Sequence, residues 1–259
     1  MTRIDSIKIA PEHGFRGEGD LFLPENPLGA PVAIVIHGGG WTAMDKTTIT
    51  PFSLLLTECG YAAFSVNYRL LNDAPWPACG DDCLRSTEFL LSAGHPAMKE
   101  LDRSRILILG ASAGGHLALW TGLNLPPEKV RAIISIAGPS NLIMQKDKWD
   151  KKPEFWGKFL GGAVTDEKLM AASPVTYVKS GVPRLLCIHS TNDKLVLPEQ
   201  SRFMIDAYAK VNAEAELFIF PGKRTNHGIW TDGSGEVSKD KRIIVPEVRS
   251  VISSFLKRI

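Results

Sequence analysis

Short apolar segments of strand length recur along the chain and alternate with longer amphipathic segments. This alternation limits the possible folds most strongly, because strands separated by helices form a parallel sheet that helices cover on both faces. The expected strands are rich in β-branched residues and comprise 6–10, 20–23, 32–36, 62–67, 106–109, 132–136, 184–188 and 216–220. The expected helices carry apolar residues three and four positions apart and comprise 48–59, 83–93, 113–123, 199–211 and 246–257.

The first two expected strands differ from the later six. They are short and mixed in polarity, which is typical of an antiparallel edge, whereas the later strands are continuously apolar, which is typical of parallel strands buried on both faces. No linker rich in Ser, Gly or Pro and no internal repeat divides the sequence. We therefore expect a single α/β domain over residues 1–259, built on a mostly parallel eight-stranded sheet.

Charge and hydrophobicity argue against two classes of partner. The 30 basic and 28 acidic residues leave a net charge of +2, which gives no electrostatic reason to bind nucleic acid. The longest apolar runs, such as 32–36, are far too short to cross a membrane, and Arg3, Asp5 and Lys8 interrupt any signal-peptide core. We expect a cytoplasmic protein, or an exported one if a leader has been removed, without nucleic-acid or membrane partners. The sequence leaves its oligomeric state open.

The four cysteines do not form a recognisable framework. Cys59, Cys79, Cys83 and Cys187 are too few to hold a domain of this size by disulfides, and they lack the paired CxxC spacing of a zinc site. Cys79 and Cys83 are one helical turn apart, so they form either a small bridged loop or two free thiols. Metal-binding and nucleotide-binding motifs are also absent from the sequence, so we expect neither a metal nor another cofactor.

A small-residue motif follows the strand expected at 106–109. The segment GASAGGH at 110–116 places Ser112 between this strand and an apolar helix. A sharp strand-to-helix turn needs small residues on either side, because the backbone segments pass close to each other. Ser112 then projects from the turn at a helix N-terminus, which favours developing negative charge. Ser112 is the candidate nucleophile.

A second glycine-rich motif follows the strand expected at 32–36. Three successive glycines after His37 leave backbone N–H groups uncovered, so that they can bind an oxyanion. The candidate donors are Gly39 and Gly40, together with Ala113 after the nucleophile. Which of the glycine amides point inward is left open, and we expect His37 to anchor the loop rather than to transfer protons.

A serine hydroxyl needs a base, and the base needs an acid that orients it. Asp193 follows the strand expected at 184–188, and His227 follows the strand expected at 216–220. Both would lie at the carboxyl edge of the sheet, near Ser112. We therefore predict a triad of Ser112, Asp193 and His227, and we interpret His116 as a packed core residue.

Together these motifs resemble the α/β-hydrolase superfamily, most closely the esterase and lipase group that includes hormone-sensitive-lipase-like enzymes and bifunctional feruloyl and acetyl xylan esterases. The resemblance rests on HGGGW at 37–41, NYRL at 67–70, GASAGGHLA at 110–118, LGG at 160–162, ASPVTY at 172–177, and Asp193 followed by Val196. Two departures are His189-Ser190, where the family commonly has His-Gly, and a longer link at 223–226. The resemblance implies a serine carboxylesterase for short acyl esters, with acetyl or feruloyl groups on carbohydrate as candidate substrates.

The resemblance also raises the question of what surrounds the site. The oxyanion motif begins at residue 37, which leaves little chain for an N-terminal cap. The insertion at 138–182 is expected to form a wall of the pocket, although its aromatic residues fit a core equally well. The candidate pocket residues are Trp41, Trp230 and Trp156. Two other functions stay open, namely an arylformamidase and a non-catalytic ligand-binding protein on the same scaffold.

Overall fold

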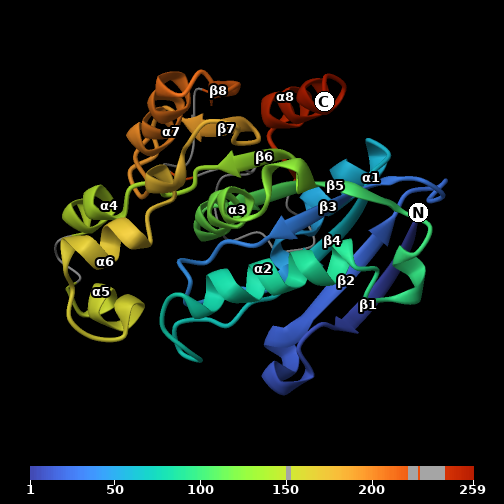
Figure 1. Cartoon of the computed structure of the whole chain (residues 1–259), viewed down its shortest axis with the longest axis horizontal. Coiled ribbons are helices and arrows are strands. Elements are labelled where there is room, and N and C mark those ends of the chain that lie inside the picture. The colour runs from blue at the N-terminus through green and yellow to red at the C-terminus, as the bar shows by residue number, and fades with distance from the viewer. Residues whose placement is uncertain (150–152, 221–226, 228–242) are drawn as a thin grey trace.

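The apolar runs pair into one eight-stranded sheet in the computed structural model, which describes residues 1–149, 153–220, 227 and 243–259 (Figure 1). The strand order is β1-β2-β4-β3-β5-β6-β7-β8. The strands are β1 (Thr2–Lys8), β2 (Glu18–Leu23), β3 (Pro31–Ile36), β4 (Ala62–Val66), β5 (Asp102–Ala111), β6 (Val130–Ile136), β7 (Arg184–Ser190) and β8 (Ala215–Phe220). The pairs β1–β2 and β2–β4 are antiparallel and all others are parallel, so the predicted sheet with an antiparallel edge is confirmed.

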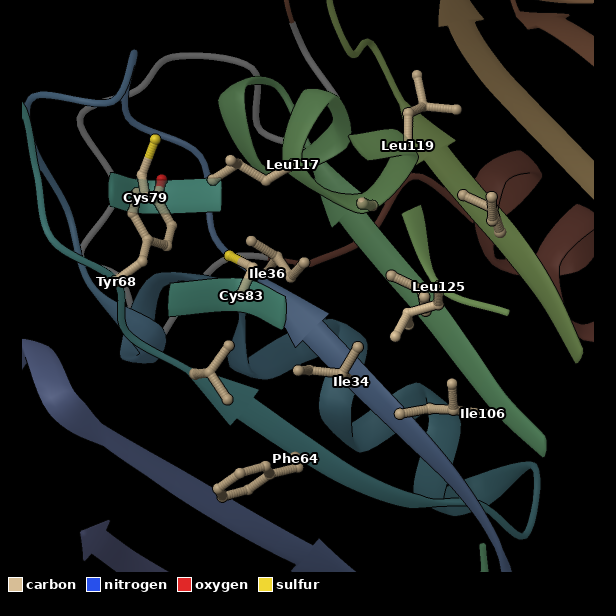
Figure 2. Packing of buried hydrophobic residues seen from close by; sticks show 14 of the residues in the cluster. Ile34, Ile36, Phe64, Tyr68, Cys79, Cys83, Ile106, Leu117, Leu119 and Leu125 are labelled. Carbon is tan, nitrogen blue, oxygen red and sulfur yellow. The ribbon is translucent and has the colours of Figure 1, made fainter. Parts of the chain in front are cut away.

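Both faces of the sheet are covered by helices. Along β3, Ile34 and Ile36 pack in the core shared with α2 (Ala78–Leu91), α3 (Ala113–Asn124) and α7 (Glu199–Lys210), part of which Figure 2 shows. The intervening Ala33 and Val35 pack in a second core with α1 (Thr50–Glu58) and α8 (Pro246–Leu256). Because successive strand residues face opposite sides, a strand covered on both sides must be apolar throughout.

The first strand begins earlier than the sequence pattern indicates. We expected it at 6–10, but β1 spans Thr2–Lys8 and pairs with β2 at the edge of the sheet. Most of its side chains are exposed, so apolar residues are not needed to form it and cannot mark its position. The part of the chain before β3 thus forms an antiparallel β-ribbon rather than a helical cap.

The insertion at 138–182 contains three short helices that the periodicity did not predict. They are α4 (Leu142–Lys148), α5 (Pro153–Leu160) and α6 (Asp166–Ala171), and they lie together at one end of the molecule (Figure 1). Side chains cap two of them, since Asn141 accepts from the Met144 N–H and Thr165 accepts from the Lys168 N–H. Helices this short contain too few turns to give a clear apolar repeat.

Cys79 and Cys83, which the sequence left as either bridged or free, both lie on α2. Cys79 and Cys83 are both free thiols and lie buried near Tyr68, Ile36 and Leu117 (Figure 2). Burial raises the pKa of Cys79 to about 12, so the thiol stays protonated and unreactive at neutral pH. None of the described helices is both long enough and apolar enough to cross a membrane.

Candidate active site

Ser112 lies in the sharp turn between β5 and α3. Its backbone has φ of 58° and ψ of −124°, a strained conformation for a residue with a side chain. A Cβ at Gly110 would collide with the Gly114 carbonyl, and one at Gly114 would collide with the Ile36 carbonyl, so only glycine fits at either position. The Ser112 N–H donates to Ile136 O over 2.8 Å. The turn therefore holds the hydroxyl at the carboxyl edge of the central strands.

The structure brings Ser112, His227 and Asp193 together. His227 Nδ1 lies 2.6 Å from Asp193 Oδ2, and His227 Nε2 lies 2.8 Å from Ser112 Oγ. An ionised carboxylate only accepts hydrogen bonds, so Nδ1 carries the proton and Nε2 accepts from the serine hydroxyl. This is the arrangement in which an imidazole can remove the hydroxyl proton.

Asp193 is held in the loop after β7 and is 2% exposed. Its Oδ1 accepts from the N–H groups of Leu195 and Val196 at 3.0 and 2.9 Å, while Oδ2 faces His227. Burial by itself would raise the pKa of Asp193, but hydrogen bonds from His189 and His227 bring it below its ordinary value. The carboxylate is therefore ionised at neutral pH and can orient His227.

The glycine loop after β3 lies against Ser112. Gly39 and Gly40 have φ of 108° and 58° and line a pocket beside the hydroxyl. Among the described residues, the N–H groups of Gly39, Gly40 and Ala113 have no hydrogen-bond acceptor. These donors are available to a bound oxyanion.

His37 fixes the start of this loop. It is fully buried and stacks on Tyr68 with ring centroids 4.2 Å apart. Its Nδ1 donates to Gly38 O over 2.7 Å, and the Tyr68 hydroxyl donates to His37 O over 2.9 Å. These contacts agree with the anchoring role expected for His37. His116 is likewise a packed core residue, and burial lowers its pKa to about 4.

The pocket beside Ser112 has a volume of about 320 Å³. Met44, Ile49 and Leu195 line it and are residues that the sequence analysis missed. No local motif marks Met44 and Ile49, which reach the site because the segment after the glycine loop folds over the sheet edge. Leu195 reaches it from the loop that carries Asp193. The described lining consists of Gly38, Gly39, Gly40, Ala43, Met44, Thr48, Ile49, Ala111, Ser112, Ile136, Ala137, Leu195 and His227. This lining suits a small uncharged group.

The expectation that Trp41 and Trp156 line the pocket was wrong. Each is 1% exposed, and both pack edge-on against Phe159, with ring centroids 5.2 and 5.6 Å apart. Trp41 Nε1 also donates to His116 Nδ1 over 3.3 Å. Large rings gain most by leaving water completely, and the insertion offers an aromatic core that buries them. The third candidate, Trp230, lies outside the described residues.

We expect Trp156→Ala to lower the free energy of unfolding by about 3–5 kcal/mol, because it leaves a cavity in this aromatic core. Urea denaturation followed by circular dichroism measures the change. The matched control is Met170→Ala, which removes an exposed apolar side chain from the same insertion and should change stability little. Equal effects of the two substitutions would contradict a core role for Trp156.

The insertion was expected to form a wall of the pocket, and its described residues contact the loop that carries Asp193. Gln145 Nε2 and Trp149 Nε1 donate to the carbonyl oxygen of Leu195 over 3.0 and 3.2 Å. The N–H of the same Leu195 binds Asp193. The described insertion residues therefore support the loop that carries the acid.

The sheet order and the site define the class of this protein, which is an α/β-hydrolase of the esterase type. Residues 20–208 match the family model BD-FAE, and the chain belongs to that family.

Two curated relatives are esterases by name. The chain is 27% identical to the probable isoprenylcysteine alpha-carbonyl methylesterase ICMEL1 of Oryza sativa subsp. japonica, over 92% of this chain and 60% of the relative. It is 30% identical to esterase LipQ of Mycobacterium tuberculosis, over 73% of this chain and 49% of the relative. The chain thus spans less than two thirds of the length of either protein.

Solved structures share the fold over nearly the whole chain. A truncated carbohydrate esterase from gut microbiota aligns with a TM-score of 0.81 at 21% identity, covering 100% of this chain and 96% of that one. An acetyl ester-xyloside bifunctional hydrolase from Caldicellulosiruptor lactoaceticus aligns with a TM-score of 0.76 at 25% identity, covering 96% of this chain and 90% of that one.

Proposed function

We propose that this protein is a serine carboxylesterase that hydrolyses short-chain acyl esters. The observation that carries the proposal is the hydrogen-bonded chain from Asp193 through His227 to Ser112, beside an apolar pocket of about 320 Å³. This volume is near the lower end of the range for small-molecule sites, which favours acetyl to butyryl groups over long acyl chains.

The proposed reaction has two halves. His227 Nε2 takes the hydroxyl proton as Ser112 Oγ attacks the ester carbonyl, and the imidazolium then protonates the leaving alcohol. Water attacks the resulting acyl-enzyme with His227 again acting as the base, which releases the carboxylic acid and restores the serine. The N–H groups of Gly39, Gly40 and Ala113 stabilise the oxyanion in both halves. Asp193 stays ionised and stabilises the imidazolium.

Carbohydrate esters are the natural substrate class that we propose. The support is the likeness to the carbohydrate esterase and to the acetyl ester-xyloside hydrolase, together with membership of the BD-FAE family. Acetyl groups suit the small pocket better than bulky feruloyl groups do. Acetylated xylo-oligosaccharides should therefore be hydrolysed faster than feruloylated ones.

The first test is release of p-nitrophenol from the acetate, butyrate and octanoate esters. We expect kcat/KM to be highest for the acetate or butyrate and lower for the octanoate, because a long chain exceeds the pocket. Ser112→Ala is the control for contaminating esterases. A preference for octanoate would contradict the small acyl site. Faster hydrolysis of N-formylkynurenine than of any acetyl ester would instead assign an arylformamidase.

A further inference from the structure

A second histidine lies next to the proposed triad, and the reaction above gives it no part. His189 is near the end of β7, four residues before Asp193, and is fully buried. Its Nε2 lies 2.8 Å from Val196 O and 3.3 Å from Asp193 Oδ2. Its Nδ1 lies 2.7 Å from the hydroxyl oxygen of Ser201 on α7.

These contacts show which nitrogen of the His189 ring carries a hydrogen. The Val196 carbonyl and the Asp193 carboxylate are both acceptors only, so His189 Nε2 carries a hydrogen. The hydrogen is directed mainly to Val196 O and, over the longer distance, to Oδ2. The Ser201 hydroxyl hydrogen-bonds to Nδ1 and holds the ring in this orientation.

His189 thereby holds the acid loop at two points. Val196 donates its N–H to Asp193 Oδ1 and accepts from His189 through its carbonyl, so the ring fixes the turn that binds Oδ1. The same ring faces Oδ2, the oxygen that binds His227. Because β7 is paired on both sides, the ring is attached to a rigid element.

We propose that His189 is a positioning residue, which orients the Asp193 carboxylate so that Oδ2 meets His227 Nδ1. This inference rests on the proposed function, in which Asp193 and His227 act on Ser112. Hydrogen bonds behind a reacting group set its geometry, and small errors of placement cost large factors in rate.

The test compares His189→Phe with His189→Gln. Phenylalanine keeps a ring but removes both nitrogens, whereas glutamine keeps an N–H donor that can reach Val196 O and Oδ2. We expect His189→Phe to lower kcat about 10–100-fold with KM changed less than about 3-fold, because orientation rather than binding is lost. His189→Gln should recover most of kcat. The matched control is Thr87→Val, which removes a buried side-chain hydrogen bond on α2, and its kcat should equal that of the wild type.

A second readout does not depend on the substrate. The His227 Nδ1 proton bound to Asp193 should give a downfield proton NMR resonance in the wild-type protein, which His189→Phe abolishes or shifts and His189→Gln restores. The rate at which a fluorophosphonate labels Ser112 should fall by a factor similar to kcat. If His189→Phe does not fold, Ser201→Ala tests the same support and should lower kcat by a smaller factor.

The possible failures are distinguishable. An unchanged kcat and an unchanged resonance in His189→Phe would overturn the positioning role, as would a loss of kcat that His189→Gln does not recover. A wild-type protein that cleaves no ester but shows the resonance and its loss would overturn the proposed function and leave the role of His189 standing.

Discussion

Ser112→Ala is expected to lower kcat by about four to six orders of magnitude while the protein stays folded, because the reaction loses its nucleophile. Alanine fits the turn as well as serine does, and among the described residues the Ser112 hydroxyl hydrogen-bonds to His227 alone. Release of p-nitrophenol from p-nitrophenyl acetate measures the loss of kcat. Urea denaturation should give an unfolding midpoint close to that of the wild type.

His227→Ala provides the internal check. Since the hydroxyl and the imidazole act as one unit, the double substitution of Ser112 and His227 should be no slower than either single substitution. Retention of more than about a tenth of the wild-type kcat by either single variant would contradict the mechanism.

Asp193→Asn is expected to lower kcat by about 10⁴-fold, because the substitution favours the wrong tautomer of His227. The N–H groups of Leu195 and Val196 both point at Oδ1, so they hold the amide oxygen there and turn the NH₂ group towards His227. His227 Nδ1 must then accept, the proton moves to Nε2, and Nε2 can no longer take the proton of Ser112.

The matched control for this prediction is Asp206→Asn, the same change on the exposed side of α7, which should leave kcat unchanged. The measurement is kcat/KM on p-nitrophenyl acetate at neutral pH, with circular dichroism to confirm folding. An Asp193→Asn variant within about tenfold of the wild type would show that another acid orients His227.

The central strands and the turn at Ser112 are properties of local sequence. Six apolar runs become parallel strands, of which only the edge strand β8 is largely half-buried rather than buried. The small residues around Ser112 leave one sharp turn between β5 and α3. Asp193 and His227 could be proposed from their positions after two other strands, since parallel strands end at one edge of a sheet. What the sequence does not contain is the hydrogen-bond geometry that joins them.

Side-chain direction is where sequence reasoning failed. Trp41 follows the glycine loop directly and Trp156 lies in the insertion, yet both pack into the aromatic core. Met44 and Ile49 line the pocket although no motif contains them, and Leu195 lines it from its position between Asp193 and Val196. The edge strand β1 was misplaced for a related reason, because a strand with most of its side chains exposed leaves no apolar pattern.

From the sequence alone followed the order of the strands and of the five longer helices, the turn that presents Ser112 and the chain order of the three proposed catalytic residues. These depend on backbone sterics and on periodic burial, which act over a few residues. Long-range packing set which rings fill the core, which side chains line the pocket, and that His189 faces Asp193. Those contacts join segments far apart in the chain, and they follow from close packing that no short stretch of sequence specifies.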